Sequence, residues 1–278
     1  MNLLKSLSAL TVRKKDHCAS QPTGYPSEED RLRRLPQVDR SISPNDGMYN
    51  GNIDTYLNCG LSAVINIENA LAAAGNMPVK SVLDFASGYG RVLRHLVASF
   101  PKAEFTASEI EADALSYCQA TFGTNIFLSG KNLNELSMGR TFDLIWSGSL
   151  MTHLDEDNAV NLLNFFHRHT RPGGLAVFST HGKFVLNQLV EQWKEVVASG
   201  SDEHPYGLYR EDVDTIVSLL EKTGYGYANY WGQDRYGISV CSQEWMQRTL
   251  DRLGGWRLVY FRERSWNKHH DVVGLVKV

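Results

Sequence analysis

The 278-residue sequence predicts an α/β fold in which helices cover both faces of a doubly wound, mostly parallel sheet. Three observations predict it. Short β-branched runs alternate with amphipathic stripes between residues 78 and 180, a glycine-containing turn joins the first run to a helix, and two further strands close the chain. Alternation of strands and helices is typical of right-handed βαβ units, which build parallel sheets.

Residues 1–45 are expected to form a mobile arm, because Ser, Pro and charged residues dominate them. The pattern allows one short helix there, at about Glu28–Leu35. From Asn52 to Ala74 apolar residues recur at helical spacing, and Gly75 ends that helix. Residues 46–278 are expected to form a single domain with this helix as an N-terminal cover.

Five predicted strands build the core of that domain, residues 78–180. They are Ser81–Phe85, Glu104–Ser108, Asn125–Leu128, Phe142–Ser147 and Leu175–Thr180. Helical stripes separate the strands, and their apolar members are Val92, Leu93, Leu96 and Val97, then Leu115, Cys118 and Phe122, then Ala159, Leu162, Leu163 and Phe166.

The segment from Gly182 to Gly255 departs from this alternation. It contains three helical patterns, and a loop or short hairpin rich in Tyr and Gly at Gly224–Val240. We expect a lid-like insertion that contacts substrate, residues 182–255, because residues 256–278 are needed to finish the sheet. The loop between strands Trp256–Arg262 and Asp271–Val278 is too short for a helical crossover, so these strands are predicted to pair antiparallel.

Composition excludes several classes of protein. Hydrophobic residues make up 42% and charged residues 21%, which argues against a disordered chain. No apolar run reaches 18 residues, and residues 1–10 lack the continuous apolar stretch of a signal peptide, so we expect a cytoplasmic protein without integral membrane association. The net charge of −3 argues against a nucleic-acid partner.

The four cysteines match no C-x-x-C zinc or redox pattern. A disulfide framework is formally open, but buried reduced thiols are the preferred interpretation in a chain of this length.

The first candidate ligand-binding residues lie where the first strand ends, in the stretch Asp84–Gly90. A glycine-containing turn that leads into a helix lets a ligand approach the backbone and the helix N-terminus. The spacing G-x-G-x-x-G is absent. Glu109 ends the second strand 19 residues after Gly90, where an acid can accept hydrogen bonds from ribose hydroxyls. The alternative for Glu109 is an exposed residue at a helix start.

Together these motifs resemble the class I (Rossmann-like) S-adenosylmethionine-dependent methyltransferases, over about residues 45–180 and more loosely to the C-terminus. The family pattern acid-x-Gly-x-Gly-x-Gly is matched by Asp84–Gly90, with Ala86 in place of the first glycine. Phe142–Ser147 resembles the fourth strand of the family, and Arg171–Leu175 resembles its Pro-Gly-Gly turn into strand five.

The resemblance implies a seven-stranded sheet with an antiparallel last strand, S-adenosyl-L-methionine as cofactor, and residues 78–180 as the cofactor-binding core. It places Ala86–Gly90 at the methionine moiety, Asn132 where the family usually has an Asp that contacts the adenine amino group, and Asp46, Met48 and Tyr49 over the cofactor. The implied cofactor contacts are Tyr56, Asp84, Ala86, Ser87, Gly88, Gly90, Glu109, Ile110, Asn132, Leu133 and Ser147.

His153 is the candidate general base. Methyl transfer to an oxygen that is not acidic needs a base near neutral pH, which favours histidine. His153 lies just beyond the fourth predicted strand; the alternative is a histidine that packs or caps the helix starting at Asp155–Asn158. His181 follows the fifth strand and points to the same edge of the sheet.

The remaining candidates would contact the acceptor. Adjacent residues of one strand face opposite sides, so His269 and His270 are not expected to chelate together, and no metal site is predicted. His270 remains a candidate substrate contact. The segment Gly224–Val240 adds Tyr230, Trp231, Asp234 and Tyr236, beside Tyr225 and Tyr227. These residues suit stacking on a sugar or ring, and nearly as well suit a hairpin packed on a helix. Tyr49 is a further candidate contact.

The predicted function is therefore methyl transfer from S-adenosyl-L-methionine to a small-molecule or glycan acceptor, with oxygen the favoured atom. Ser147–Leu150 stands where an Asn/Asp-Pro-Pro-Tyr motif of amine methylation would lie, and no Pro-Cys dipeptide is present. A protein side chain stays open as acceptor. A non-catalytic partner that binds the cofactor also stays open, as does a nicotinamide-dependent oxidoreductase, against which the missing G-x-G-x-x-G speaks.

Overall fold

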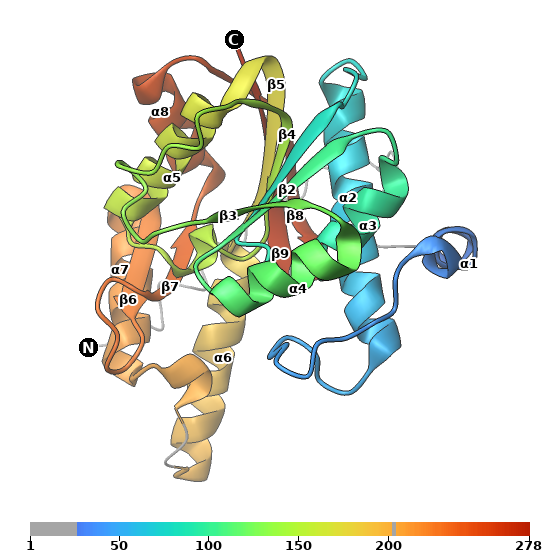
Figure 1. Ribbon diagram of the computed structural model, residues 1–278. Coiled ribbons are helices and arrows are strands. Elements are labelled where there is room, and N and C mark those ends of the chain that lie inside the picture. The colour runs from blue at the N-terminus through green and yellow to red at the C-terminus, as the bar shows by residue number, and fades with distance from the viewer. Residues whose placement is uncertain (1–26, 202–203) are drawn as a thin grey trace.

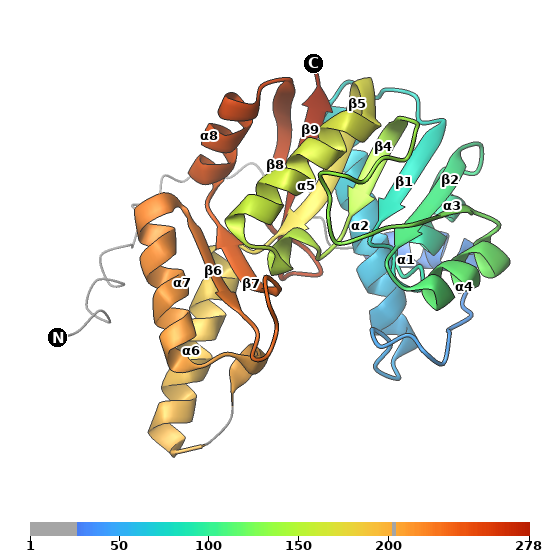
Figure 2. The ribbon, with the colours of Figure 1, turned by 60° about the vertical axis from the view of Figure 1, so that its left-hand side comes forward.

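The computed structural model describes residues 27–201 and 204–278 and contains a seven-stranded sheet with helices on both faces (Figures 1 and 2). The strand order is β3-β2-β1-β4-β5-β9-β8. Strand β9 runs antiparallel to both of its neighbours, while the β1–β5 pairs are parallel. The predicted α/β sheet with an antiparallel last strand is confirmed.

The sheet strands lie close to their predicted positions. They are β1 (Ser81–Phe85), β2 (Glu104–Glu109), β3 (Asn125–Leu128), β4 (Phe142–Ser147), β5 (Thr170–Thr180), β8 (Trp256–Trp266) and β9 (His270–Lys277). Strand β5 begins five residues before Leu175, because a register shift opposite Phe142 and Leu144 admits the Pro-Gly-Gly stretch as an irregular part of the strand.

Two apolar clusters pack the two faces of the sheet. On one face lie α2 (Ile53–Ala73), α3 (Leu93–Ser99) and α4 (Ala112–Phe122). On the other lie α5 (Glu156–His169) and α8 (Gln243–Leu253). All six residues of β4 are buried, as expected for a central strand covered on both sides.

A buried polar network joins α2 to β8. The Asn66 amide donates to the Ser265 carbonyl at 2.9 Å and accepts from the Tyr260 hydroxyl at 2.9 Å. The Trp266 indole donates to the Cys59 carbonyl at 2.9 Å. Burying a polar group without a hydrogen-bond partner is unfavourable in free energy. The network therefore fixes the position of α2 relative to β8.

Part of the segment predicted to be a mobile arm contacts the domain. Residues 1–26, with Arg13–Lys15 and Cys18, lie outside the described residues. Within residues 27–45, Leu35, Val38 and Ile42 pack into one apolar cluster. The short helix is confirmed as α1 (Glu28–Arg34), which a 3₁₀ turn at Leu35–Gln37 follows. Val38 is buried in an apolar cluster with Tyr56. Its side chain thus attaches this proline-rich segment to α2.

Arg94 holds this segment in place. Its side chain is 2% exposed and lies between the rings of Tyr56 and Phe122, 5.1 and 5.2 Å from their centroids. Its guanidinium donates to the carbonyls of Asp39 and Ser41 at 3.1 and 2.7 Å. It also donates to the carbonyls of Tyr89 and Gly90, at 3.4 and 3.0 Å, and thus holds the end of the glycine-containing turn.

A separate group of elements extends beyond the carboxyl ends of the parallel strands (Figures 1 and 2). It contains α6 (Lys183–Ser199), a 3₁₀ turn at Pro205–Gly207, α7 (Arg210–Thr223), and strands β6 (Tyr225–Asn229) and β7 (Gly237–Cys241). The two strands pair antiparallel, which confirms the hairpin, and the group has an apolar cluster of its own.

The three cysteines among the described residues, Cys59, Cys118 and Cys241, are buried and free. Within residues 27–201 and 204–278, no helix is both long and apolar enough to cross a bilayer.

Arg94→Met is expected to lower the free energy of unfolding by about 3 kcal/mol or more, because four carbonyls lose a charged donor. Urea unfolding followed by circular dichroism measures it. The matched control is Arg33→Met, whose side chain is 64% exposed and should change stability by no more than about 0.5 kcal/mol. Equal stability of the two variants would contradict the anchoring role.

Candidate cofactor and acceptor site

The glycine-containing turn lies at the carboxyl end of β1. Its backbone enters the left-handed region at Ala86, Gly88 and Gly90, with φ of 61°, 51° and 78°. Ala86 thus adopts the conformation that the family's glycine would take freely. A Cβ on Gly90 would lie 2.4 Å from the Phe122 ring, so this position has no room for a side chain.

Glu109 is brought to this turn by the sheet register, which pairs Phe85 of β1 with Ser108 of β2. One carboxylate oxygen accepts from the Gly88 N–H at 2.9 Å and the other from the Ile110 N–H at 2.7 Å. The acid therefore organises the turn as well as presenting its remaining lone pairs at the edge of the sheet.

Asp84 lies beneath the turn and is 2% exposed. Its Oδ2 has no hydrogen-bond partner in the part of the chain that the structure describes. Burial, reinforced by the nearby Glu109 charge, raises the pKa of Asp84 to about 8. The buried hydroxyls of Ser108 and Ser147, at the ends of β2 and β4, also lack partners among these residues. Unsatisfied groups along one edge are what a polar ligand would satisfy.

The other predicted cofactor residues occupy different environments. Ile110 is 53% exposed and offers apolar surface beside Glu109. Asn132 is exposed, but its side-chain oxygen accepts from the Asn134 N–H at 3.2 Å. Leu133 is buried in the apolar cluster under α5, so its side chain belongs to the core.

Tyr56 is buried rather than open toward a ligand. Its hydroxyl donates to Asp46 Oδ2 at 2.5 Å, and Tyr49 packs edge-on against its ring at 5.8 Å. Burial and this hydrogen bond raise the pKa of Tyr56 far above its usual value. Met48 is exposed. The segment predicted to cover the cofactor is thus organised by the buried Tyr56–Asp46 pair.

His153 ends the 3₁₀ turn Met151–His153 that follows β4. Its Nδ1 lies 3.0 Å from the Gly237 carbonyl and 3.0 Å from the Tyr230 hydroxyl. Because a carbonyl can only accept, Nδ1 carries the proton and Nε2 keeps a lone pair. Tyr236 stacks on the ring with centroids 5.0 Å apart. Burial lowers the pKa of His153 below its usual value, so the neutral form is present at pH 7.

His181 and His270 lie together at the same edge, with ring centroids 4.7 Å apart. The expectation that His269 and His270 face opposite sides is wrong. His269 lies in the turn before β9, and its ring is 5.0 Å from that of His270. The alternation rule does not apply, since only His270 belongs to the strand.

Two of the hairpin residues predicted to contact the acceptor are exposed to solvent. Trp231 is 79% exposed, and Asp234 is exposed. Tyr230 and Tyr236, the other two hairpin residues predicted to contact the acceptor, both contact His153. Sequence reasoning missed Arg94 and His269. The signal for Arg94 was a charged residue within the otherwise apolar stripe from Val92 to Val97.

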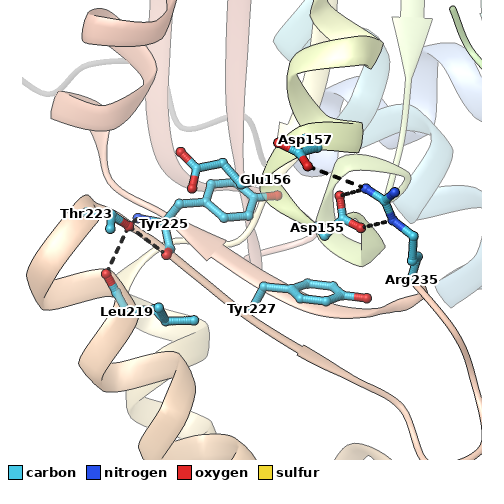
Figure 3. A pocket seen from close by; sticks show the side chains of 8 residues that line it. All are labelled: Asp155, Glu156, Asp157, Leu219, Thr223, Tyr225, Tyr227 and Arg235. Carbon is cyan, nitrogen blue, oxygen red and sulfur yellow. Dashed lines mark hydrogen bonds and ion pairs between the residues drawn. The ribbon is translucent and has the colours of Figure 1, made fainter.

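A surface depression of about 450 Å³ lies between the start of α5 and the β6–β7 hairpin (Figure 3). It is lined by Asp155, Glu156, Asp157, Leu219, Thr223, Tyr225, Tyr227 and Arg235. Arg235 points at Asp155, with its Nε 2.6 Å from Oδ2 and its Nη2 3.0 Å from Oδ1 (Figure 3). The Tyr225 hydroxyl donates to the Leu154 carbonyl at 2.8 Å. These contacts fasten the β6–β7 hairpin to the start of α5, which is a structural role.

Ala86→Gly is expected to raise the free energy of unfolding by about 1 kcal/mol, because φ of 61° disfavours a side chain. Chemical denaturation measures the change. Ala120→Gly, at an exposed position inside α4, is the matched control and should lower stability by about 0.5 to 1 kcal/mol. A loss of stability at both positions would show that Ala86 is unstrained.

Comparison with known proteins agrees with this arrangement. Residues 82–174 match a family model described as a methyltransferase domain. No curated protein sequence matches the chain.

Two solved structures share the fold. A S-adenosylmethionine-dependent methyltransferase from Clostridium acetobutylicum ATCC 824 is 14% identical with a TM-score of 0.50, over 82% of this chain and 93% of that chain. Magnesium protoporphyrin IX methyltransferase from Synechocystis PCC 6803, solved with bound SAH, is 13% identical with a TM-score of 0.50, over 90% of this chain and 94% of that one. With residues 82–174 matching a methyltransferase domain, the chain has the fold of the class I S-adenosylmethionine-dependent methyltransferases.

Proposed function

We propose that this protein transfers a methyl group from S-adenosyl-L-methionine to an oxygen atom of a small-molecule or glycan acceptor. The observation that carries the proposal is His153. Its tautomer leaves a lone pair on Nε2, and its low pKa keeps that lone pair free at neutral pH, next to the edge where the glycine-containing turn lies.

The residues present fit S-adenosylmethionine. The turn at Ala86–Gly90 exposes backbone, and the unpartnered Asp84 oxygen lies under it. Glu109 stands at the end of β2, where ribose hydroxyls would donate to it, and Ile110 supplies apolar surface for the adenine ring. When bound, the cofactor supplies an electrophilic methyl group on a sulfonium.

The chain's own task is then to align the acceptor, exclude water and accept a proton. His153 Nε2 would accept the acceptor's hydroxyl proton, while the Gly237 carbonyl holds the ring and stabilises the imidazolium that forms. Tyr230 and Tyr236, which contact His153, would pack against a ring-shaped acceptor.

We further propose that residues 182–255 cover the acceptor. Helices α6 and α7 and the β6–β7 hairpin extend beyond the edge at which His153 lies, and the hairpin contributes the Gly237 carbonyl (Figure 2). This placement supports a role in excluding water from the acceptor side.

Glu109→Ala is expected to weaken binding of S-adenosylhomocysteine at least tenfold, about 1.4 kcal/mol, since the ribose loses a charged acceptor and the Gly88 N–H loses its partner. Calorimetry measures the affinity. Glu104→Ala, at the opposite end of β2, is the matched control and should bind normally.

S-adenosylhomocysteine should raise the melting temperature of the wild-type protein, whereas NAD should not. Stabilisation by NAD alone would overturn the methyltransferase proposal in favour of a nicotinamide-dependent enzyme.

His153→Ala is expected to lower methyl transfer at least 100-fold while affinity for S-adenosylhomocysteine is unchanged. A panel of hydroxylated metabolites and glycans, scored for methyl incorporation, supplies the acceptor. Because burial lowers the pKa of His153 from its usual value, the base form predominates at neutral pH. The wild-type rate should therefore change little above neutral pH and fall in acid solution, as Nε2 becomes protonated.

His167→Ala is the matched control, because His167 packs on Trp256 away from the site. Turnover by His153→Ala equal to that of this control would reject the base role. Cofactor binding without methyl transfer to any acceptor class in the panel would favour the non-catalytic alternative.

A further inference from the structure

Three histidines converge at the acceptor side of the sheet edge. His181 follows β5, His270 begins β9 and His269 lies in the turn between β8 and β9. Each offers one ring nitrogen, and these nitrogens lie within 4.8 Å of one another. His181 is buried, and His269 and His270 are partly buried.

The surroundings orient the rings as a metal site requires. His181 Nδ1 lies 3.1 Å from the Ser239 carbonyl, so Nδ1–H donates and Nε2 is left as the free nitrogen. His270 Nδ1 lies 3.1 Å from Ser179 Oγ. Histidines that bind metals typically hold their second nitrogen in such a hydrogen bond, which sets the tautomer and the direction of the lone pair.

Burial favours the neutral form of all three rings. Burial lowers the pKa of His181 to about 3, and burial with the neighbouring histidines lowers the pKa of His270 well below its usual value. Burial and the charge of Arg264 lower the pKa of His269. Neutral imidazoles are the form that coordinates metal ions.

We propose that His181, His269 and His270 bind a divalent transition-metal ion, with Zn²⁺ the expected ion, in a three-histidine site that keeps a fourth position open. Zn²⁺ favours imidazole ligands at about 2.0–2.1 Å in tetrahedral geometry, which sets ligand nitrogens about 3.4 Å apart. His269 can approach the other two, because it lies in the turn of residues 267–269 and not in a paired strand.

The charges around the cluster indicate what fills the open position. Arg264 lies over the Phe184 ring at 3.7 Å, and Phe184 contacts the His269 ring. Arg91 lies over Trp266, which packs on His270. These two cations favour an anionic fourth ligand, while the neighbouring Asp271 carboxyl, which accepts from the Arg264 N–H at 2.8 Å, offsets part of their charge. This role rests on the proposed function: the open position would take the acceptor oxygen and favour loss of its proton.

Metal binding is tested directly on untagged, full-length protein freed of metal by dialysis against a chelator. Addition of Co²⁺ should produce the visible absorption of a tetrahedral site with one equivalent bound, and calorimetry with Zn²⁺ should give the same stoichiometry. His181→Ala and His269→Ala should each weaken binding at least 100-fold, while His167→Ala should bind like the wild type. His269 is only partly buried, so its variant keeps the test valid if His181→Ala fails to fold.

No one-to-one binding by the wild type, or equal binding by His269→Ala, would overturn the site. Binding of S-adenosylhomocysteine is measured on the same samples. Loss of metal binding with cofactor binding intact contradicts the metal site alone, whereas a wild type that binds metal but not S-adenosylhomocysteine contradicts the proposed function alone.

Discussion

The buried guanidinium of Arg94 is the contact on which the cofactor side of this structure depends. It satisfies two carbonyls of the glycine-containing turn and two of the N-terminal segment. A planar group with five donors can hold both at once, whereas the compact ammonium of lysine could not span them. The turn that would face the cofactor and the segment that would cover it are therefore held by one side chain of α3.

Burial acts in opposite directions on the two kinds of titratable group at the sheet edge. It keeps the proton on Asp84, whose pKa rises to about 8, and keeps protons off the histidines, with the pKa of His181 at about 3. The carboxylates lie at the carboxyl ends of β1 and β2. The imidazoles lie after β4 and β5, in the turn before β9 and at the start of β9. Near pH 7 the charge of this edge therefore comes from Glu109, from Asp271, whose pKa burial raises only to about 6, and from the flanking arginines.

Much of this arrangement follows from local pattern. Alternating strand and helix periods place each strand of the sheet to within a few residues, because packing on both faces demands a nearly continuous apolar run in strands such as β4. The acid Glu109 could be predicted for the same reason, since the carboxyl ends of neighbouring parallel strands meet at one edge. The irregular start of β5 could not, because a register shift depends on the partner strand.

The sequence by itself determined the fold class, the glycine-containing turn and the two acids beside it, because each depends on spacing along a single strand or helix. Only the tertiary structure decided the rest. The carbonyls of Asp39 and Ser41 are held by Arg94, which lies more than 50 positions away along the chain. His269 and His270 share one side because a turn, not a strand, contains the first of them. His153 has its proton on Nδ1 because the Gly237 carbonyl, 84 positions later, lies against it. Contacts between distant segments leave no local period, so composition and spacing could not show them.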